Sequence, residues 1–367
     1  MSVSASAEHT LKLPMDADAA SPSPAVRRAR YLMGTVWMIE AMAADELVAQ
    51  RAVGQAFDEV ARIERWASRF LPTSDVARIN ASAGGESAVC EPELVALLER
   101  CRMYTQLTDG AFDVTIGGAL TEVSSVKCQV SSGRAKRFFH TLHFTHDTIG
   151  HAPHAEQDRR RWRAGATVGS RFLKVDVARY RVRLAKHGMA IDLGGVAKGY
   201  AVDRAISALR YGGATGGVVN AGGNLRVFGS GASRTVAVRD PRMPSRMLRR
   251  LALSDAAVAT SGNYERTVQG MVGHLVDPAT GATSTTDALS VTVVADAAET
   301  ADAYSTALFV MGVRRGVAWA QRQRIRAVMV AAQPLLWYRH RIAVTEVGVS
   351  RACVSACVLE TRAHVFM

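Results

Sequence analysis

The sequence lacks any long apolar run. No stretch of its 367 residues approaches the roughly 20 apolar residues that a membrane-spanning helix needs. Residues 1–26 also lack the apolar core of a signal peptide and a lipidation cysteine. They are rich in Ser, Ala and Pro without periodicity, which is typical of a disordered leader. We therefore expect no membrane span and a cytoplasmic location.

Cysteine is scarce as well. The five cysteines are an odd number at unrelated spacings, and they lack the partners that a zinc site requires. We expect reduced, mostly structural thiols. These residues are Cys90, Cys101, Cys128, Cys353 and Cys357.

The formal net charge of +12 raises the question of nucleic-acid binding. Between Ser124 and Lys186, Lys and Arg outnumber Asp and Glu by 14 to 4, including the run Arg159–Arg163. The aromatic residues of this segment do not alternate with the basic ones in the way that single-strand binders use. Five histidines of this segment could chelate a metal adventitiously, but no Cys or carboxylate stands in ligand register. The pattern favours a solvated insertion over a nucleic-acid surface.

The stretch GMAIDLGGVAKGYAVDRAI, Gly188–Ile206, predicts a strand, a tight glycine turn and the start of a helix. It matches neither GxGxxG nor GxxxxGK[ST], so neither a Rossmann fold nor a P-loop follows. The backbone N–H groups at a helix start suit an anion such as phosphate, and Lys198 adds a positive charge. A merely tight turn is the alternative.

Three oxygen-bearing side chains share one face of a helix predicted from Ala298. Asp302, Ser305 and Thr306 stand at positions i, i+3 and i+4, a set that suits a hard cation such as Mg²⁺. The hydroxyls could equally bond back to the helix backbone.

Two loops carry further candidates. The segment 109–118 combines two aspartates with three glycines, which indicates close approach to a ligand or simply a helix stop and turn. His274 precedes the turn Asp277–Pro278, which the proline and Gly281 make rigid. A lone histidine is more often structural than catalytic.

Periodicity predicts the remaining elements. We expect strands at 31–42, 172–184, 236–239 and 290–295, two strands within 217–228, a basic hairpin at 243–253 and a strand end within 257–266. Helices are expected at 45–68, from Ser74 to near Asn80, at 93–108, from 198 to Gly212–Gly213 and at 298–319.

Taken together, eight segments in order resemble the ApbE family of FAD:protein FMN transferases. The matches are MGT at 33–35, SDVARIN at 74–80, DGAFDVTIG at 109–117, IDLGGVAKGYAVD at 191–203, NAGGN at 220–224, ATSGNYER at 259–266, HLVDPATG at 274–281 and SVTVVADAAETADAYSTALFVMG at 290–312. The resemblance implies an α+β fold with mixed or antiparallel sheets flanked by helices and an FAD site between two halves. It implies one transferase domain at 27–330, with a poorly matching insertion at 121–167 and tail at 331–367.

The resemblance also implies an activity. It is the Mg²⁺-dependent transfer of the FMN moiety of FAD to a Thr or Ser hydroxyl of an acceptor flavoprotein, with release of AMP. The alternatives are hydrolysis of FAD to FMN and AMP in the same site, and FAD binding without turnover. No nucleic-acid partner is expected.

Residue roles follow from the matching positions. The implied catalytic residues are His274, Asp302 and Lys198. The implied FAD contacts are Met33, Phe70, Asp109, Gly110, Ala111, Asp192, Lys198, His274 and Val276. The implied metal ligands are the backbone carbonyl of Ala197, Asp302, Ser305 and Thr306.

The chain departs from the family pattern at three positions. Phe70 replaces a tyrosine that often stacks on the flavin, which keeps the stacking but loses the hydroxyl. Asn224 and Asn263 stand where an aspartate is frequent, which removes negative charge.

Overall fold

The computed structural model describes residues 25–120, 168–229, 233–243, 245–262, 275–333, 341–347 and 364–365. The helices are α1 (Glu46–Ala67), α2 (Asp75–Ala81), α3 (Pro92–Leu107), the 3-10 turn η1 (Ser170–Phe172), α6 (Ala197–Tyr211) and α7 (Ala298–Arg322). The strands are β1 (Ala25–Leu32), β2 (Thr35–Met42), β3 (Ala88–Val89), β4 (Leu173–Asp176), β5 (Arg181–Leu184), β6 (Gly216–Ala221), β7 (Asn224–Gly229), β8 (Arg234–Arg239), β9 (Met247–Leu253), β10 (Ala257–Gly262), β11 (Ala288–Ala295), β12 (Arg326–Gln333), β13 (Arg341–Val347) and β14 (His364–Val365).

A nine-stranded sheet organises the larger part of the protein. Its order is β1-β2-β6-β7-β10-β11-β12-β13-β14, and neighbouring strands pair antiparallel. The helices α1, α6 and α7 pack against β1–β2, β6–β7 and β10–β12, respectively. The α+β fold class predicted from the sequence is confirmed.

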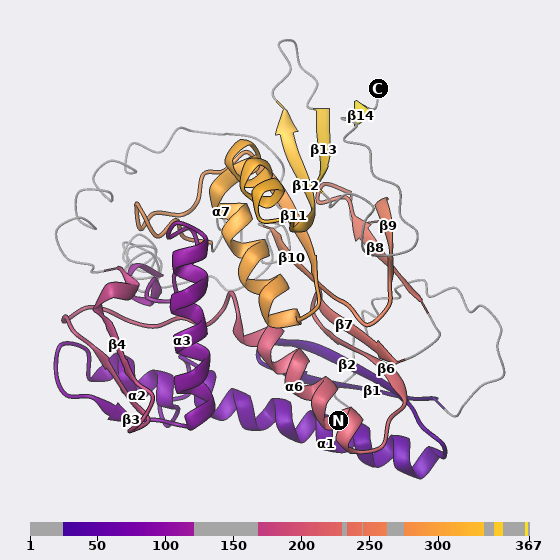
Figure 1. Ribbon diagram of the computed structural model, residues 1–367, viewed down its shortest axis with the longest axis horizontal. Coiled ribbons are helices and arrows are strands. Elements are labelled where there is room, and N and C mark those ends of the chain that lie inside the picture. Colours follow the sequence, from indigo (N-terminus) through magenta and orange to yellow (C-terminus); the bar gives the residue numbers. More distant parts are fainter. Residues whose placement is uncertain are drawn as a thin grey trace, which may run out of the picture.

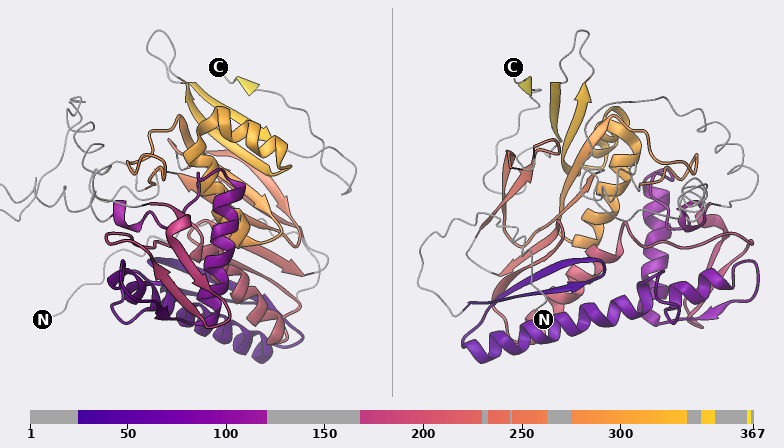
Figure 2. Two further views of the ribbon diagram at one scale, coloured as in Figure 1. Left: turned by 60° about the vertical axis from the view of Figure 1, so that its left-hand side comes forward. Right: turned by 180° about the vertical axis from the view of Figure 1, so that it is seen from behind.

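A smaller part lies beside this sheet. It contains α2, α3 and the three-stranded sheet β3-β5-β4, and it stands at the left in Figure 1. The long helix α1 runs beneath both parts, as Figure 1 and the right-hand view of Figure 2 show. Its predicted helical pattern is confirmed, since one face of α1 is buried at Val53, Phe57, Val60 and Ile63.

The opposite face of the large sheet is covered locally by the hairpin β8–β9. A second small core forms there, in which Val218, Val227 and Val258 of the sheet pack with Leu253 of β9. Because β6, β7 and β10 are buried on both faces, they cannot shift in register without exposing apolar side chains. They form a fixed floor for the loops at their ends.

Three strand predictions need correction. The predicted strand 31–42 is a hairpin, because Met33 (φ 48°) and Gly34 (φ 74°) turn the chain between β1 and β2. The predicted strand 172–184 is two short strands, β4 and β5, joined by a turn. The apolar run before Asp192 forms only a single parallel bridge, between Ile116 and Ala190.

Other local predictions are confirmed. Ser74 caps α2 by accepting a hydrogen bond from the N–H of Ala77 at 3.0 Å. The hairpin in 217–228 and the helix ending before Gly212 are present. Cys90 and Cys101 are buried free thiols, whereas the other three cysteines and the insertion 121–167 lie outside the described residues.

The predicted tail contributes to the same sheet. Strand β12 ends at Gln333, β13 pairs with it along seven positions, and β14 pairs with β13. Among the described residues, no helix has both the length and the apolar composition to cross a bilayer.

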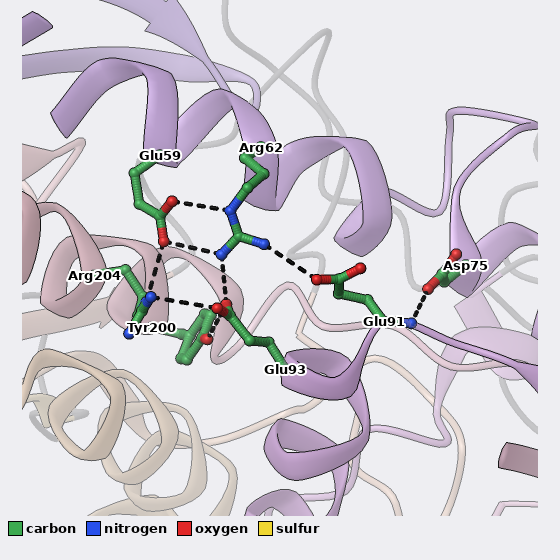
Figure 3. Close-up of polar contacts among 7 residues, drawn as sticks. All are labelled: Glu59, Arg62, Asp75, Glu91, Glu93, Tyr200 and Arg204. Carbon is green, nitrogen blue, oxygen red and sulfur yellow. Dashed lines mark hydrogen bonds and ion pairs between the residues drawn. The ribbon is translucent and has the colours of Figure 1, made fainter. Parts of the chain in front are cut away.

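A polar network ties α1, α3 and α6 together (Figure 3). Arg62 of α1 bonds Glu59 at 2.9 Å and Glu93 of α3 at 2.7 Å. From α6, Tyr200 donates to Glu93 at 2.7 Å and Arg204 to Glu59 at 3.1 Å. The hydrogen bond from Arg62 lowers the pKa of Glu59, so this stabilisation is present at neutral pH and is lost as acid protonates the carboxyl.

Helices α6 and α7 approach each other very closely. A Cβ at Gly199 of α6 would lie 2.2 Å from the carbonyl oxygen of Ala298 and 2.8 Å from the Cβ of Asp302. The N–H of Gly199 donates to Asp302 Oδ2 at 3.0 Å. In return, Asp203 of α6 accepts from the N–H groups of Ala298 and Glu299 at 3.0 and 2.9 Å. Each helix therefore caps the start of the other.

We predict that Gly199→Ala lowers the free energy of unfolding by about 3 kcal/mol, because the methyl group forces two backbones apart. Urea denaturation measures the change. The control is Gly54→Ala in α1, where an added Cβ meets nothing within 4 Å. It should raise stability by about 0.5–1 kcal/mol. Equal effects of the two substitutions would contradict the prediction.

Candidate functional site

An open cavity lies where the two parts of the protein meet. Its empty volume, with the open mouth included, is about 1100 Å³. The lining residues fall within 69, 111–120, 192–198, 222–224, 260–262, 275–278 and 302–306. Most of these segments belong to the motifs that the sequence singled out.

The glycine turn before α6 forms one wall. Asp192 Oδ1 accepts the N–H of Gly194 at 2.6 Å, which closes the turn, and Lys198 Nζ donates to the carbonyl of Gly194 at 3.1 Å. A Cβ at Gly195 would lie 3.0 Å from Thr306 Oγ1, so glycine lets the turn approach α7. The start of α6 and one lysine thus face the cavity, as an anion-binding site requires.

The turn is held in place from two sides. The Asn80 side chain donates to the carbonyl of Ile191 at 3.0 Å and accepts its N–H at 2.7 Å. The N–H of Asp192 donates to the carbonyl of Val114 at 2.8 Å. The segments 111–118 and 190–195 therefore lie side by side, although the sequence separates them widely.

Asp302 supplies a buried carboxylate. The residue is 4% exposed and accepts the N–H of Gly199, but within the described residues it has no ion pair. Thr306 also lines the cavity. A buried carboxylate is costly without a compensating positive charge, so the pair fits a divalent cation with oxygen ligands.

The hydroxyl of Ser305 is already engaged. Ser305 is fully buried; its hydroxyl donates to the carbonyl of Asp302 at 3.0 Å and lies 2.8 Å from the hydroxyl of Ser261. The back-bonding alternative raised by the sequence is therefore confirmed for Ser305, and the cation site stays a prediction. Ser305 bonds back to the backbone, and Asp302 with Thr306 faces the cavity.

Asp113 is a second buried carboxylate that lines the cavity, and it was not singled out from the sequence. Burial raises its pKa. Hydrogen bonds from the Thr115 hydroxyl and N–H and from the Ser170 N–H, at 2.7, 2.8 and 3.0 Å, oppose that shift. Through its bond to Ser170, Asp113 ties the loop 111–118 to η1. Only its position within DGAFDVTIG could have pointed to it.

Asn224 is 2% exposed and lines the cavity. Its Nδ2 is buried and has no hydrogen-bond partner in the described part of the chain. Buried amide groups are normally hydrogen-bonded, so this donor is available to a ligand. From the sequence, Asn224 is equally a candidate ligand contact and a candidate turn residue, and it is also a departure from the frequent aspartate.

The predicted site residues divide into three groups. Those that line the cavity are Ala111, Asp192, Lys198, Val276, Asp302 and Thr306. Those described elsewhere are Met33, Phe70, Asp109, Gly110, Ala197 and Ser305. His274 and Asn263 lie outside the described residues. In the sequence, His274 directly precedes Leu275, which lines the cavity.

Except for Met33, the predicted site residues that do not line the cavity are close in sequence to residues that do. Met33 forms the β1–β2 turn and donates its N–H to Glu64 at 2.9 Å. Asp109 (φ 52°) and Gly110 (φ 79°) turn the chain after α3. Phe70 follows the cavity residue Arg69, and Ala197 precedes Lys198. The structure thus leaves their predicted ligand contacts as predictions.

Fold and cavity define an α+β protein with a cavity whose lining suits an anionic ligand. The ApbE family profile matches residues 33–329, and the chain belongs to the ApbE family. The resemblance inferred from the eight segments is confirmed.

Curated relatives support this assignment. The FAD:protein FMN transferase of Treponema pallidum is 29% identical over 293 residues, covering 73% of each chain. The enzyme of the same name from Klebsiella pneumoniae is 28% identical and covers 82% of this chain and 87% of its own. In Rhodobacter capsulatus a relative of that name is 29% identical, but the match spans only 56% of its length.

Solved structures agree with the fold. The ApbE protein of Thermotoga maritima superposes with a TM-score of 0.69 at 29% identity, covering 84% of this chain and 94% of its own. The flavinyl transferase ApbE of Pseudomonas stutzeri gives the same TM-score at 22% identity and covers 88% of this chain and 94% of its own.

We predict that Asn224→Leu leaves the free energy of unfolding within about 1 kcal/mol of the original, because no hydrogen bond of the Nδ2 group is lost. The same substitution should weaken binding of FAD about five-fold or more, the worth of one ligand hydrogen bond. Urea denaturation and calorimetric titration with FAD measure the two effects.

The matched control is Asn80→Leu. It removes both bonds to Ile191 and should cost about 2 kcal/mol of stability. If Asn224→Leu were as destabilising as this control, the amide would be satisfied within the protein.

Proposed function

We propose that this protein transfers the FMN moiety of FAD to a Thr or Ser hydroxyl of an acceptor flavoprotein, with release of AMP and dependence on Mg²⁺. The observation that carries the proposal is the meeting of two motifs at one cavity. Lys198 with the start of α6, and Asp302 with Thr306 on α7, face the same space. The name shared by the curated relatives supports the same activity.

The reaction exchanges one phosphorus–oxygen bond for another. The acceptor hydroxyl oxygen forms a bond to the phosphorus of the FMN half, and the bond from that phosphorus to the bridging oxygen breaks. AMP leaves with the bridging oxygen, and the hydroxyl proton passes to a base. Such a transfer depends on positioning and on stabilising negative charge.

The chain offers groups for both tasks. Lys198 and the N-terminal end of α6 would hold the pyrophosphate oxygens, because the turn at Gly194 and Gly195 leaves the backbone accessible. Val276 and Leu275 form an apolar wall. His274, the residue before them, would accept the hydroxyl proton.

Asp302 and Thr306 would hold the magnesium ion, with the carbonyl of Ala197 as a third ligand implied by the resemblance. Ser305 would join them only by giving up its bond to Ser261 or to the Asp302 carbonyl. When bound, the ion would neutralise charge developing on the pyrophosphate.

One incubation separates this function from its alternatives. The purified protein is mixed with FAD, Mg²⁺ and a candidate acceptor flavoprotein, and the products are separated by denaturing electrophoresis and chromatography. Flavin covalently attached to the acceptor, with AMP, is the expected result. Free FMN with AMP and no labelled acceptor would indicate a pyrophosphatase, and no product would indicate FAD binding alone.

We predict that Asp302→Asn lowers Mg²⁺-dependent FMN transfer by about 100-fold or more, because the charge that holds the cation is removed. The asparagine oxygen can still accept the N–H of Gly199, so the fold should be retained. Initial rates at a series of Mg²⁺ concentrations measure the effect.

Asp203→Asn is the matched control, since Asp203 caps α7 as Asp302 caps α6 but does not line the cavity. It should reduce stability and leave the transfer rate of the folded protein largely unchanged. An unaltered rate and Mg²⁺ dependence in Asp302→Asn would exclude Asp302 as a ligand.

A further inference from the structure

The loop between α1 and α2 presents an aromatic ring to solvent beside the cavity. Phe70 is 79% exposed, although its neighbours are well anchored. Ser74 donates to the carbonyl of Ser68, and the N–H of Phe70 donates to Ser68 Oγ at 3.2 Å. The loop is therefore fixed in place, while the side chain of Phe70 itself is largely exposed to solvent.

One face of the Phe70 ring is covered by Arg69. The Cζ atom of Arg69 lies 4.6 Å from the ring centroid, within the range of a cation–π contact. Arg69 also lines the cavity. Arg69 therefore contacts the ring and also lines the cavity.

Arg69 is itself fixed by Asp192. Its Nε lies 2.8 Å from Asp192 Oδ2, and the two side chains are 27% and 13% exposed. The other carboxylate oxygen of Asp192 accepts the N–H of Gly194. Because Asp192 is bound into the glycine turn, the ion pair fixes the position of the α1–α2 loop relative to the cavity wall that carries Lys198.

We propose that Arg69 is a positioning residue that orients Phe70 for stacking on the flavin ring of FAD, with Asp192 as its anchor. This inference rests on the proposed function, since it assigns the flavin half of that substrate to the Arg69–Phe70 side of the cavity. It gives Asp192 an indirect role: the carboxylate acts through Arg69 rather than on the ligand.

The contacts argue for positioning rather than for a general structural role. A guanidinium stacked on one face of a ring leaves the other face for a planar ligand. It also restricts the rotamers of Phe70, so less side-chain entropy is lost when the ligand binds. Flavin and pyrophosphate would then bind to two walls that one ion pair holds together.

The test is Arg69→Met in the full-length protein, titrated with FAD, FMN and ADP in the presence of Mg²⁺. We expect the dissociation constants of FAD and FMN to rise about five-fold, the cost of ordering one side chain on binding. That of ADP, which carries no flavin, should stay unchanged. Quenching of flavin fluorescence on binding should also decrease, because it reports stacking on the ring.

The chain offers a closely matched control. Arg30 of β1 has its Cζ 4.7 Å from the ring of Phe57 and its Nη1 3.6 Å from Asp58, and it does not line the cavity. Arg30→Met removes the same two kinds of contact and should leave all three affinities unchanged. Melting temperatures of both variants show that each is folded.

Two further variants separate the parts of the proposal. In a Phe70→Ala background, Arg69→Met should raise the dissociation constant of FAD by a further factor of less than about two, because the ring through which Arg69 acts is gone. Arg69→Lys keeps the charge but not the planar stack and should recover FAD affinity only in part.

Some results would overturn the inference. They are unchanged FAD and FMN affinities in Arg69→Met, an equal loss of ADP affinity, or an additive effect on Phe70→Ala. These readouts concern binding, so they stand whether or not the original protein attaches flavin to an acceptor. A protein that binds FAD as expected but transfers nothing would refute the proposed activity and leave the role of Arg69 intact.

Discussion

The reciprocal capping of α6 and α7 is the constraint on which the rest of the site depends. Neither helix has a side-chain cap of its own, since Val196 and Ala297 stand at the two cap positions. Asp302 of α7 satisfies an N–H at the start of α6, and Asp203 of α6 satisfies two at the start of α7. Both capping groups would be lost if the helices separated. The contact therefore fixes the start of each helix to the other.

This arrangement explains how Asp302 is tolerated in the interior. Asp203 is paired with Arg226, but Asp302 has no ion pair among the described residues. Its carboxylate lies instead at the positive end of α6, close to the first turn of α7, where two helix N-termini favour negative charge. The helix N-termini lower the cost of burying the carboxylate. Asp302 and Lys198 line the same cavity, which is the arrangement that the proposed binding of a cation beside an anionic ligand requires.

The sequence predicted this arrangement only in pieces. Local signals were sufficient for α1, α2, α6 and the β6–β7 hairpin, because amphipathic spacing, a serine cap and paired glycines act within a few residues. Local signals failed at 31–42, because a methionine gives no indication in the sequence that Met33 adopts a positive φ. They also failed at 188–192, where hydrogen bonds to Asn80, rather than neighbouring strands, hold the apolar run. The capping of one helix by a carboxylate of another is a tertiary contact, and no pattern within either helix shows it.

The cavity residues follow the same division. Motif positions identified Asp192, Lys198, Asp302 and Thr306. The burial of Asp113, the ion pair of Arg69 and the unpartnered amide of Asn224 became visible only in the folded chain. What these last residues share is dependence on distant partners, such as Ser170 for Asp113 and Asp192 for Arg69. Whether a polar group stabilises the fold or is available to a ligand depends on its burial and its partners. Both are set by contacts between residues that are distant in the sequence.

The unsatisfied groups of the cavity imply a link between binding and stability. The Nδ2 group of Asn224 is buried without a hydrogen-bond partner in the described chain, and such a group costs on the order of 1–3 kcal/mol. Asp302 is buried without an ion pair among the described residues. A ligand that supplies the missing partners stabilises only the folded state. Binding should therefore stabilise the protein by an amount that rises with the logarithm of the ligand concentration divided by the dissociation constant. The effect should reach the α6–α7 contact in particular, because Asp302 belongs both to the cavity wall and to the cap of α6.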